Sequence, residues 1–278
     1  MSDEHPIQTL CAAFAVSRSG YYSWRTSEGS ARAQRDQVLQ AQIAIVHANS
    51  RCTYGSPRVT KELREQGEEV GRHRVARLMR AAGLYGRQNR RFRVFTTDSR
   101  HDEPISPNRM ASIPPPTRPD RVWVSDITYV ETDEGWLYVA GVLDRCSRRL
   151  VGWATGDSLE ADLPITAMRM ALEKRRPPPG LIHHSDRGVQ YACDAYRDLL
   201  AAYNVIPSMS RRANCYDNAV MEAFWSTLKN ELVHRYNFAT RAEARAAIFD
   251  YVEVFYNRTR LHSALGYKSP LAYESNLN

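Results

Sequence analysis

The alternation of hydrophobic and polar positions after residue 120 predicts a domain of strands and helices. Residues 121–130 are rich in β-branched and aromatic side chains and apolar on both alternating faces, as expected of a central strand. Further strands are predicted at 136–143, 149–155 and 181–185. Helices are predicted at 159–175, 193–203, 218–232 and from Thr240, which forms a capping box with Glu243. With the first three strands antiparallel, this order predicts a mixed α/β core.

The first part of the chain has the pattern of short helices separated by turns. Segment 9–25 predicts two helices, the second capped by Ser17. Half of a helix-turn-helix and a small helix pair that docks on its neighbours both fit this segment. A later helix is expected to open with Ser56 as N-cap and Pro57 as first helical residue, and to end at Gly67.

The helix predicted at 72–82 has one apolar and one basic face. A turn at Gly71 precedes it, and Gly83 is suited to end it. The apolar face comprises Val75, Leu78, Met79 and Ala82. The opposite face carries His73, Arg77 and Arg80. A helix of this kind, entered through a helix and a tight turn, has the geometry of a DNA-reading helix, although solvated surface helices show the same pattern.

Charge concentrates in the same region. The 278-residue chain has a net charge of +7, which favours polyanionic partners. Residues 51–110 contain fourteen Lys and Arg against seven Asp and Glu, so their surplus of 14 − 7 = 7 equals that of the whole chain. Part of it is a basic run just beyond the predicted helix, which includes Arg87, Arg90, Arg91 and Arg93. We therefore expect double-stranded DNA to bind here.

A proline-rich stretch separates the basic region from the α/β core. Six prolines fall between Pro104 and Pro119, which disfavours regular secondary structure and predicts a stiff, extended linker. The expected organisation is a short helical segment at 1–30, a basic helix-turn-helix-like region at 31–100, the linker at 101–120, and the α/β core with a C-terminal helical extension at 121–278.

Composition excludes several classes of protein. No apolar stretch approaches the length of a membrane span, and no basic segment followed by an apolar run opens the chain, so we expect a cytoplasmic protein without membrane partners. The five cysteines are scattered and form no Cys-x-x-Cys pair. We expect reduced, mostly structural cysteines and no zinc site.

Three carboxylates are candidates for metal-dependent chemistry. Asp126 interrupts an apolar strand, where an unpaired charge is costly, and Asp186 follows a short strand. Either could instead cap a turn. Glu222 shares a narrow polar helix face with Ser226 and Lys229, as on any solvated helix. Clustered carboxylates are what two divalent ions require for phosphodiester cleavage by in-line attack.

Three sequence blocks containing these carboxylates resemble the signature of insertion-sequence transposases. They are 124–129 (VSDITY), 183–191 (HHSDRGVQY) and 214–229 (NCYDNAVMEAFWSTLK). Thirty-five residues separate Asp186 from Glu222, as in the Asp-Asp-thirty-five-Glu pattern shared with retroviral integrases. The chain is most similar to the second reading-frame product (OrfB) of the insertion sequence three family. Segments 54–58, 256–258 and 261–270 extend the similarity over nearly its whole length.

This resemblance implies a fold, a reaction and a set of residues. The fold would be a ribonuclease H-like core with a mixed five-stranded sheet and flanking helices, preceded by the small all-helical region. The reaction would be cleavage at insertion-element ends and transfer of the 3′-hydroxyl to a phosphodiester, dependent on two Mg²⁺ or Mn²⁺ ions. Asp126, Asp186 and Glu222 would be the catalytic metal ligands, and Lys229 would contact DNA near the scissile end.

The resemblance also implies partners. Family members act on paired ends, so we expect a homo-multimer on DNA, in association with the bacterial nucleoid. They usually read their terminal repeats through a segment from the first reading frame (OrfA), which carries a helix-turn-helix and a leucine zipper. This chain has no such heptad zipper. We therefore expect OrfA, or fusion to it, to be needed.

Several residues near the blocks have simpler interpretations. Asp144 is interpreted as a turn cap in preference to a fourth acidic group, and Asp217 as the cap of the helix that carries Glu222. His183 and His184 are assigned no role. A ribonuclease H or junction nuclease, which would cut without joining, and a non-catalytic DNA-binding regulator are the alternative functions.

Overall fold

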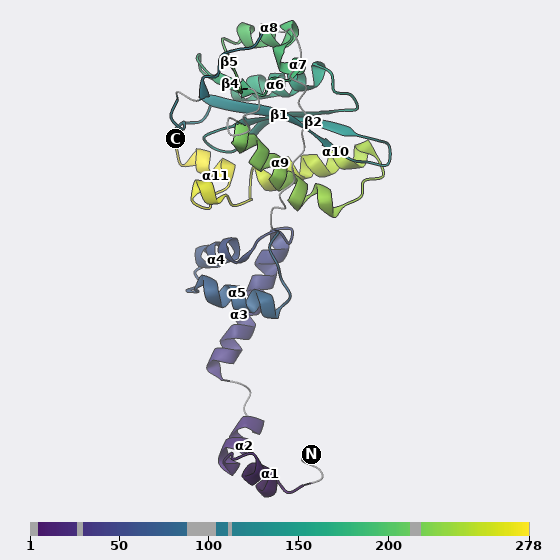
Figure 1. Ribbon diagram of the computed structural model, residues 1–278. Coiled ribbons are helices and arrows are strands. Elements are labelled where there is room, and N and C mark those ends of the chain that lie inside the picture. Colours follow the sequence, from purple (N-terminus) through teal and green to yellow (C-terminus); the bar gives the residue numbers. More distant parts are fainter. Residues whose placement is uncertain (1–4, 27–29, 88–103, 111–112, 212–217, 278) are drawn as a thin grey trace. The chain divides into compact units, whose positions relative to one another are not determined.

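The computed structural model describes residues 5–26, 30–87, 104–110, 113–211 and 218–277. It divides into two compact units, residues 1–86 and 87–278 (Figure 1). The smaller unit is all-helical, and the larger contains the sheet. No helix in the described ranges has both the length and the apolarity needed to cross a membrane.

The chain begins with a pair of short helices, α1 (Ile7–Ala13) and α2 (Arg18–Thr26). The Ser17 hydroxyl accepts a hydrogen bond from the Gly20 backbone N–H at 2.9 Å, which satisfies one of the free N–H groups at the start of α2. The predicted helix pair and its cap are confirmed.

Three helices, α3 (Ala31–Asn49), α4 (Ser56–Glu65) and α5 (Arg72–Ala81), form the rest of the smaller unit. The sequence analysis did not predict α3. Its prediction of Ser56 as N-cap was wrong by one residue, because Gly55 holds the extended cap conformation and Ser56 is already helical. Gly67 and Gly83 follow the ends of α4 and α5 with positive φ of 91° and 67°, as expected. The core between these helices includes Leu39, Ile43, Val59, Leu63, Val75, Leu78 and Met79.

The larger unit is built on a five-stranded mixed sheet in the order β3-β2-β1-β4-β5. Its strands are β1 (Val122–Val130), β2 (Leu137–Asp144), β3 (Leu150–Gly156), β4 (Ile182–Ser185) and β5 (Ile206–Met209). The first three are antiparallel, whereas β4 is parallel to both β1 and β5. The predicted fold class is confirmed, and β5 is the strand that hydrophobic pattern alone did not locate.

Helices cover both faces of the sheet (Figure 1). On one side lie α6 (Asp162–Arg175), α7 (Val189–Ala192) and α8 (Asp194–Ala202). On the other lie α9 (Ala219–Glu231), α10 (Arg241–Phe249), a π-helical turn (Asp250–Tyr256) and α11 (Pro270–Ser275), with 3₁₀ turns at Val233–Arg235 and Ser263–Leu265. The Thr240 hydroxyl accepts from the Glu243 N–H at 3.1 Å, as the capping box predicted.

The described part of the proline-rich stretch, 104–110 and 113–119, contains no α-helix or β-strand. It packs on the larger unit. The Arg109 backbone N–H donates to Ser208 Oγ at 3.0 Å, and Met110 is buried. The two compact units therefore divide after Gly86, ahead of the prolines.

Candidate active site

Asp126 lies on β1, and Asp186 directly follows β4, the parallel neighbour of β1. In the β1–β4 register, Trp123 pairs with His183 and Val124 with His184. Each aspartate thus comes two residues after the last of these pairs. Both side chains line one cavity of about 390 Å³. Its other lining residues are Ile127, Tyr129, Trp136, Tyr138, Leu159, Gly188, Val189, Gln190 and Tyr191.

The turn after β4 fixes Asp186. One Asp186 carboxylate oxygen accepts a hydrogen bond from the Gly188 backbone N–H at 3.0 Å. Gly188 in turn is the N-cap residue of α7. The aspartate thus caps a local turn and faces the cavity, so the structural and functional interpretations of this residue are compatible.

The electrostatic environment of Asp126 disfavours its charged form. Burial raises the pKa of Asp126 to about 8, and the negative charges of Asp186 and Glu222 contribute to the increase. The nearby Ile127 backbone N–H and Trp225 indole N–H lower the pKa of Asp126, against these effects. Asp126 therefore interacts through charge with both Asp186 and Glu222. Ionising Asp126 at this position costs free energy unless a cation compensates its charge.

Glu222 lies on α9, in the helix layer on the other side of the sheet from α6, α7 and α8. It lies in the first turn of α9, is exposed, and has a pKa raised by partial desolvation. It does not line the cavity that Asp126 and Asp186 share. Within the described ranges, no three His, Cys, Asp or Glu side chains lie close enough together to hold one metal ion. The structure thus pairs the two aspartates and puts Glu222 within charge range of Asp126.

Close packing against β2 sets the position of α9. Gly141, opposite Asp126 in the β1–β2 register, leaves room for the helix: an added Cβ would lie 2.6 Å from Met221 Cε and 3.0 Å from Trp225 Cη2. At the start of α9, the buried Asn218 amide donates to the Ser125 backbone carbonyl at 3.1 Å. The Glu222 helix is therefore packed on β2 at Gly141 and hydrogen-bonded to β1, the strand that carries Asp126.

Lys229 lies two turns further along α9, over the rim of the cavity. Its ammonium nitrogen is 4.8 Å from the centre of the Tyr129 ring, within cation–π range. Burial lowers the pKa of Lys229, while the Asp126 carboxylate raises it, which shows that the two charges lie close. Of the predicted polar face of α9, Lys229 therefore lies over Tyr129, which lines the cavity, whereas Glu222 does not line it.

Asp144 has a structural role. One of its carboxylate oxygens accepts from the Cys146 and Ser147 backbone N–H groups, at 2.9 and 2.8 Å, and from the Ser147 hydroxyl. The other accepts from the Asp120 N–H at 2.7 Å. The preferred interpretation as a turn cap is confirmed.

The two histidines before Asp186 are also satisfied within the core. His183 Nε2 is 2.8 Å from Ser125 Oγ, and the His184 ring nitrogens lie 2.9 and 3.0 Å from the hydroxyls of Ser208 and Ser210. Burial lowers the pKa of His183 to about 3, so the ring stays neutral. Asp217, predicted to cap α9, lies outside the described residues, and the cap position is occupied by Asn218.

On α5, the basic face is partly engaged within the smaller unit. His73, Arg77 and Arg80 are exposed, as predicted. However, Arg77 and Arg74 both donate to Asp36 of α3, at 2.5 and 2.7 Å. These hydrogen bonds lower the pKa of Asp36, the one from Arg77 most strongly. Arg87 is exposed, whereas Arg90, Arg91 and Arg93 lie outside the described residues.

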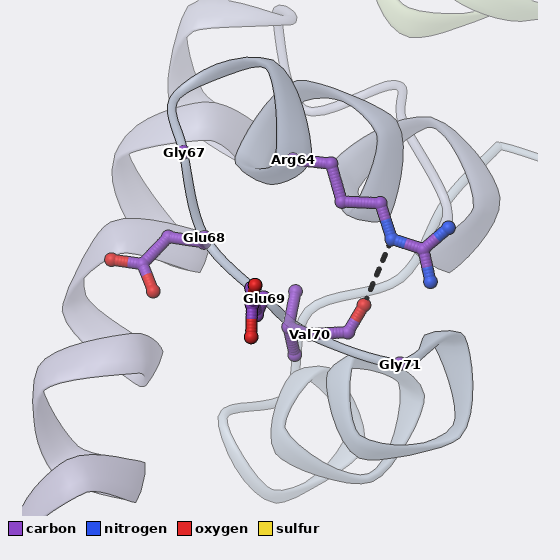
Figure 2. A pocket seen from close by; sticks show the side chains of 6 residues that line it. All are labelled: Arg64, Gly67, Glu68, Glu69, Val70 and Gly71. Atoms are coloured by element: carbon purple, nitrogen blue, oxygen red, sulfur yellow. Dashed lines mark hydrogen bonds between the residues drawn. The ribbon is translucent and has the colours of Figure 1, made fainter.

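The turn between α4 and α5 encloses a second, open depression (Figure 2). Arg64 crosses it and donates to the Val70 carbonyl at 3.0 Å. Glu68 accepts a hydrogen bond from Gln42 at 2.8 Å and pairs with Arg35, so α3 and the turn are joined. This depression thus lies in the turn of the helix–turn–helix, and its Arg64 and Glu68 side chains form contacts that hold the turn in place.

Comparisons with known proteins assign the class of each unit. Residues 116–215 match the family model for an integrase core domain, residues 222–277 match a second integrase core model, and residues 33–92 match an HTH-like domain. The fold is thus an integrase catalytic core preceded by a helix-turn-helix-like domain, as the sequence predicted.

Full-length relatives give the particular family. The chain is 48% identical to the insertion element IS600 31 kDa protein of Shigella sonnei over 95% of this chain and 97% of that protein. It is 38% identical to transposase InsF for insertion sequence IS3A of Escherichia coli over 98% of this chain and 95% of the relative. The chain therefore belongs to the IS3 family of insertion-sequence transposases, which confirms the resemblance inferred from its three blocks.

Solved structures of viral integrases are more distantly similar. A chain of the simian T-cell lymphotropic virus intasome, solved with a PP2A regulatory subunit, aligns at a TM-score of 0.49 and 14% identity, covering 83% of this chain and 74% of that one. The HTLV-2 integrase catalytic core domain, solved with magnesium, aligns at a TM-score of 0.44 and 15% identity, covering 56% and 97%.

Sequence reasoning missed the residues that shape the cavity. Its aromatic wall is formed by Tyr129, Trp136, Tyr138 and Tyr191, from β1, the β1–β2 turn, β2 and α7. Tyr129 and Tyr191 do end two of the signature blocks, which was the available signal. The positioning contacts of Gly141 and Asn218 had no comparable signal, because they depend on how α9 packs.

Proposed function

We propose that this transposase cleaves and joins DNA strands with divalent metal ions held by Asp126, Asp186 and Glu222. The observation that carries the proposal is the cavity shared by Asp126 of β1 and Asp186 just after β4, with Glu222 and Lys229 of α9 within charge range of Asp126. Two half-buried carboxylates that share a cavity are unfavourable in a merely structural role when both are charged, because neither neutralises the other.

The chemistry of these side chains fits Mg²⁺ or Mn²⁺. All three offer hard carboxylate oxygens, and two or three such groups together with substrate phosphate suffice for Mg²⁺. When bound, two ions supply activation of the attacking oxygen and stabilisation of the leaving oxygen. The protein's part is to hold the carboxylates at fixed positions, β1 and the β4 turn providing the aspartates and α9 the glutamate.

Cationic side chains would position the DNA. Lys229, at the rim of the cavity, is suited to contact a phosphate next to the scissile bond. The exposed His73, Arg77 and Arg80 of α5 and the exposed Arg87 that follows it would bind the duplex, together with Arg90 and Arg91. The substrates are the two ends of the insertion element and a target duplex.

The proposed assembly is a homo-multimer that holds both ends, assisted by OrfA or fused to it. Pairing of ends requires at least two active sites, and the main reader of the terminal repeat belongs to the first reading frame in this family. The assembly can be tested by comparing the chain alone, the chain with OrfA, and the fusion in the same joining reaction.

A strand-transfer assay on a pre-nicked element end tests the proposal. Wild type with Mg²⁺ should give joined product, and Asp126→Asn and Glu222→Gln should give none. Both variants should still bind DNA, because the basic face is unchanged. Cut but unjoined product would indicate a nuclease, and an inactive fusion that still binds DNA would indicate a regulator.

A further inference from the structure

A buried hydroxyl beside the aspartate pair has no hydrogen-bond partner in the described part of the structure. It belongs to Tyr191 of α7, whose side chain is 3% exposed and lines the cavity with Asp126 and Asp186. Buried hydroxyl groups are nearly always hydrogen-bonded, because leaving one unpaired is costly. An unpaired donor of this kind at the edge of a proposed metal site calls for an explanation.

A second tyrosine shows how the same core satisfies a hydroxyl. Tyr196 packs edge-on against Tyr191, with ring centres 5.3 Å apart. Its hydroxyl is 3.2 Å from His183 Nε2, which in turn is 2.8 Å from Ser125 Oγ. This network accounts fully for the Tyr196 hydroxyl, whereas the Tyr191 hydroxyl has no partner in the described residues and belongs to a residue that lines the cavity.

The surroundings of Tyr191 keep its hydroxyl protonated. Burial raises the pKa of Tyr191 well above its usual value, and Tyr196, Asp126 and Asp186 add to the effect. The group is therefore a hydrogen-bond donor at every physiological pH and cannot serve as a base. Asp126 and Asp186, which line the same cavity, carry carboxylate oxygens that can accept a hydrogen bond from this hydroxyl.

We propose that Tyr191 is a positioning residue, whose O–H donates to a carboxylate oxygen of Asp126 or Asp186 when these side chains hold a divalent cation. The inference rests on the proposed metal site. A carboxylate that uses one lone pair for a cation keeps others free, and a donor from the surrounding protein usually occupies them and fixes the ligand's orientation. The hydroxyl without a partner in the metal-free protein is then a preformed element of the loaded site.

Tyr191→Phe in the full-length chain tests this role without relying on catalysis. The substitution removes only the hydroxyl, so the metal-free melting temperature should stay the same or rise. Binding of Mn²⁺, measured by calorimetry, should weaken about tenfold. Tyr196→Phe is the matched control: it breaks a satisfied network, so it should lower the melting temperature and leave Mn²⁺ affinity within about twofold of wild type.

The possible outcomes separate this inference from the proposed function. If wild type binds Mn²⁺, Asp126→Asn does not, and Tyr191→Phe binds as tightly as wild type, the role of Tyr191 is overturned alone. If wild type and Asp126→Asn bind Mn²⁺ equally weakly, the metal site itself is overturned and the inference falls with it. Weakened binding by Tyr191→Phe, with Tyr196→Phe unaffected, supports both.

Discussion

Gly141 of β2 lies directly opposite Asp126 of β1, and Met221 and Trp225 of α9 pack closely over it. The residue across from the central aspartate thus determines how near the Glu222 helix can approach. Met221 can move aside for a larger residue, because its methyl group ends a flexible chain. The Trp225 ring, 3.0 Å from an added Cβ, has no such freedom.

Gly141→Ala should therefore move α9 and weaken the site. We expect a loss of about 1–3 kcal/mol in stability from overpacking, together with weaker Mn²⁺ binding and reduced strand transfer. Gly152→Ala is the matched control, because its Cβ would lie 2.2 Å from the Ala167 carbonyl oxygen of α6, on the other face. It should destabilise the protein and preserve Mn²⁺ affinity. Equal Mn²⁺ affinities for both variants would show that the position of α9 does not matter.

Asp126→Asn should stabilise the metal-free protein in a pH-dependent manner. The folded-state pKa of Asp126 is about 8, far above the value of about 3.9 in an unfolded chain. Between these values the folded protein binds a proton that the unfolded chain has released, so the wild type loses stability as pH rises. The amide variant has no such loss.

Thermal melts across this range provide the measurement. The two proteins should melt alike near pH 4 and diverge up to pH 8, where the variant should be more stable by on the order of 2 kcal/mol, allowing for water access to this half-buried group. Mn²⁺ should raise the melting temperature of wild type alone. Asp157→Asn, which removes an exposed carboxylate of the same unit, should melt like wild type throughout. A constant difference at every pH would contradict the assigned cause.

Local patterns predicted much of the larger unit because its strands and helices have strong hydrophobic periodicity. The central strand β1, the position of Asp186 after β4 and the Thr240 cap all follow from short sequence segments. Strand β5 has only four residues and contains Pro207, which weakens any strand signal. Its pairing with β4 comes from the packed fold and not from propensity.

The candidate site was predictable only in part, for a similar reason. Asp126, Asp186 and Glu222 belong to recognisable blocks, whereas their arrangement depends on long-range packing. The side-chain contact of Asn218 with the Ser125 carbonyl joins residues 93 positions apart. The ion pair between Asp36 and Arg77 joins residues 41 positions apart. It engages one arginine of a helix face that, from the sequence, looked uniformly available for DNA.

Lys229→Gln should weaken DNA binding through the loss of one phosphate contact. We expect the slope of log affinity against log salt concentration to decrease by about one. The matched control is Lys174→Gln, which removes the same charge from the larger unit at a lysine that pairs with Glu253 of the π-helical turn at 3.7 Å. The control should bind DNA like wild type. Identical salt slopes for the two variants would assign Lys229 to packing on Tyr129 and not to DNA.

Arg77 and Arg80 allow a comparison of two arginines on one helix face. Arg77 donates to Asp36, so part of its charge is compensated and its side chain is held against α3. Arg80 is exposed in the last turn of α5. Arg80→Ala should therefore reduce DNA affinity and lower the salt slope by about one, and Arg77→Ala should change both less.

For thermal stability the expected order is reversed, because Arg77→Ala should have the larger effect. Arg77→Ala leaves the Asp36 carboxylate with Arg74 as its other partner, and should lower the melting temperature of the protein. Arg80→Ala should leave it unchanged. Fluorescence anisotropy with a labelled duplex over a series of salt concentrations, alongside thermal melts, measures both effects. If Arg77→Ala reduces the salt slope as much as Arg80→Ala, the Asp36 pair opens on DNA, and both arginines contact phosphate in the complex.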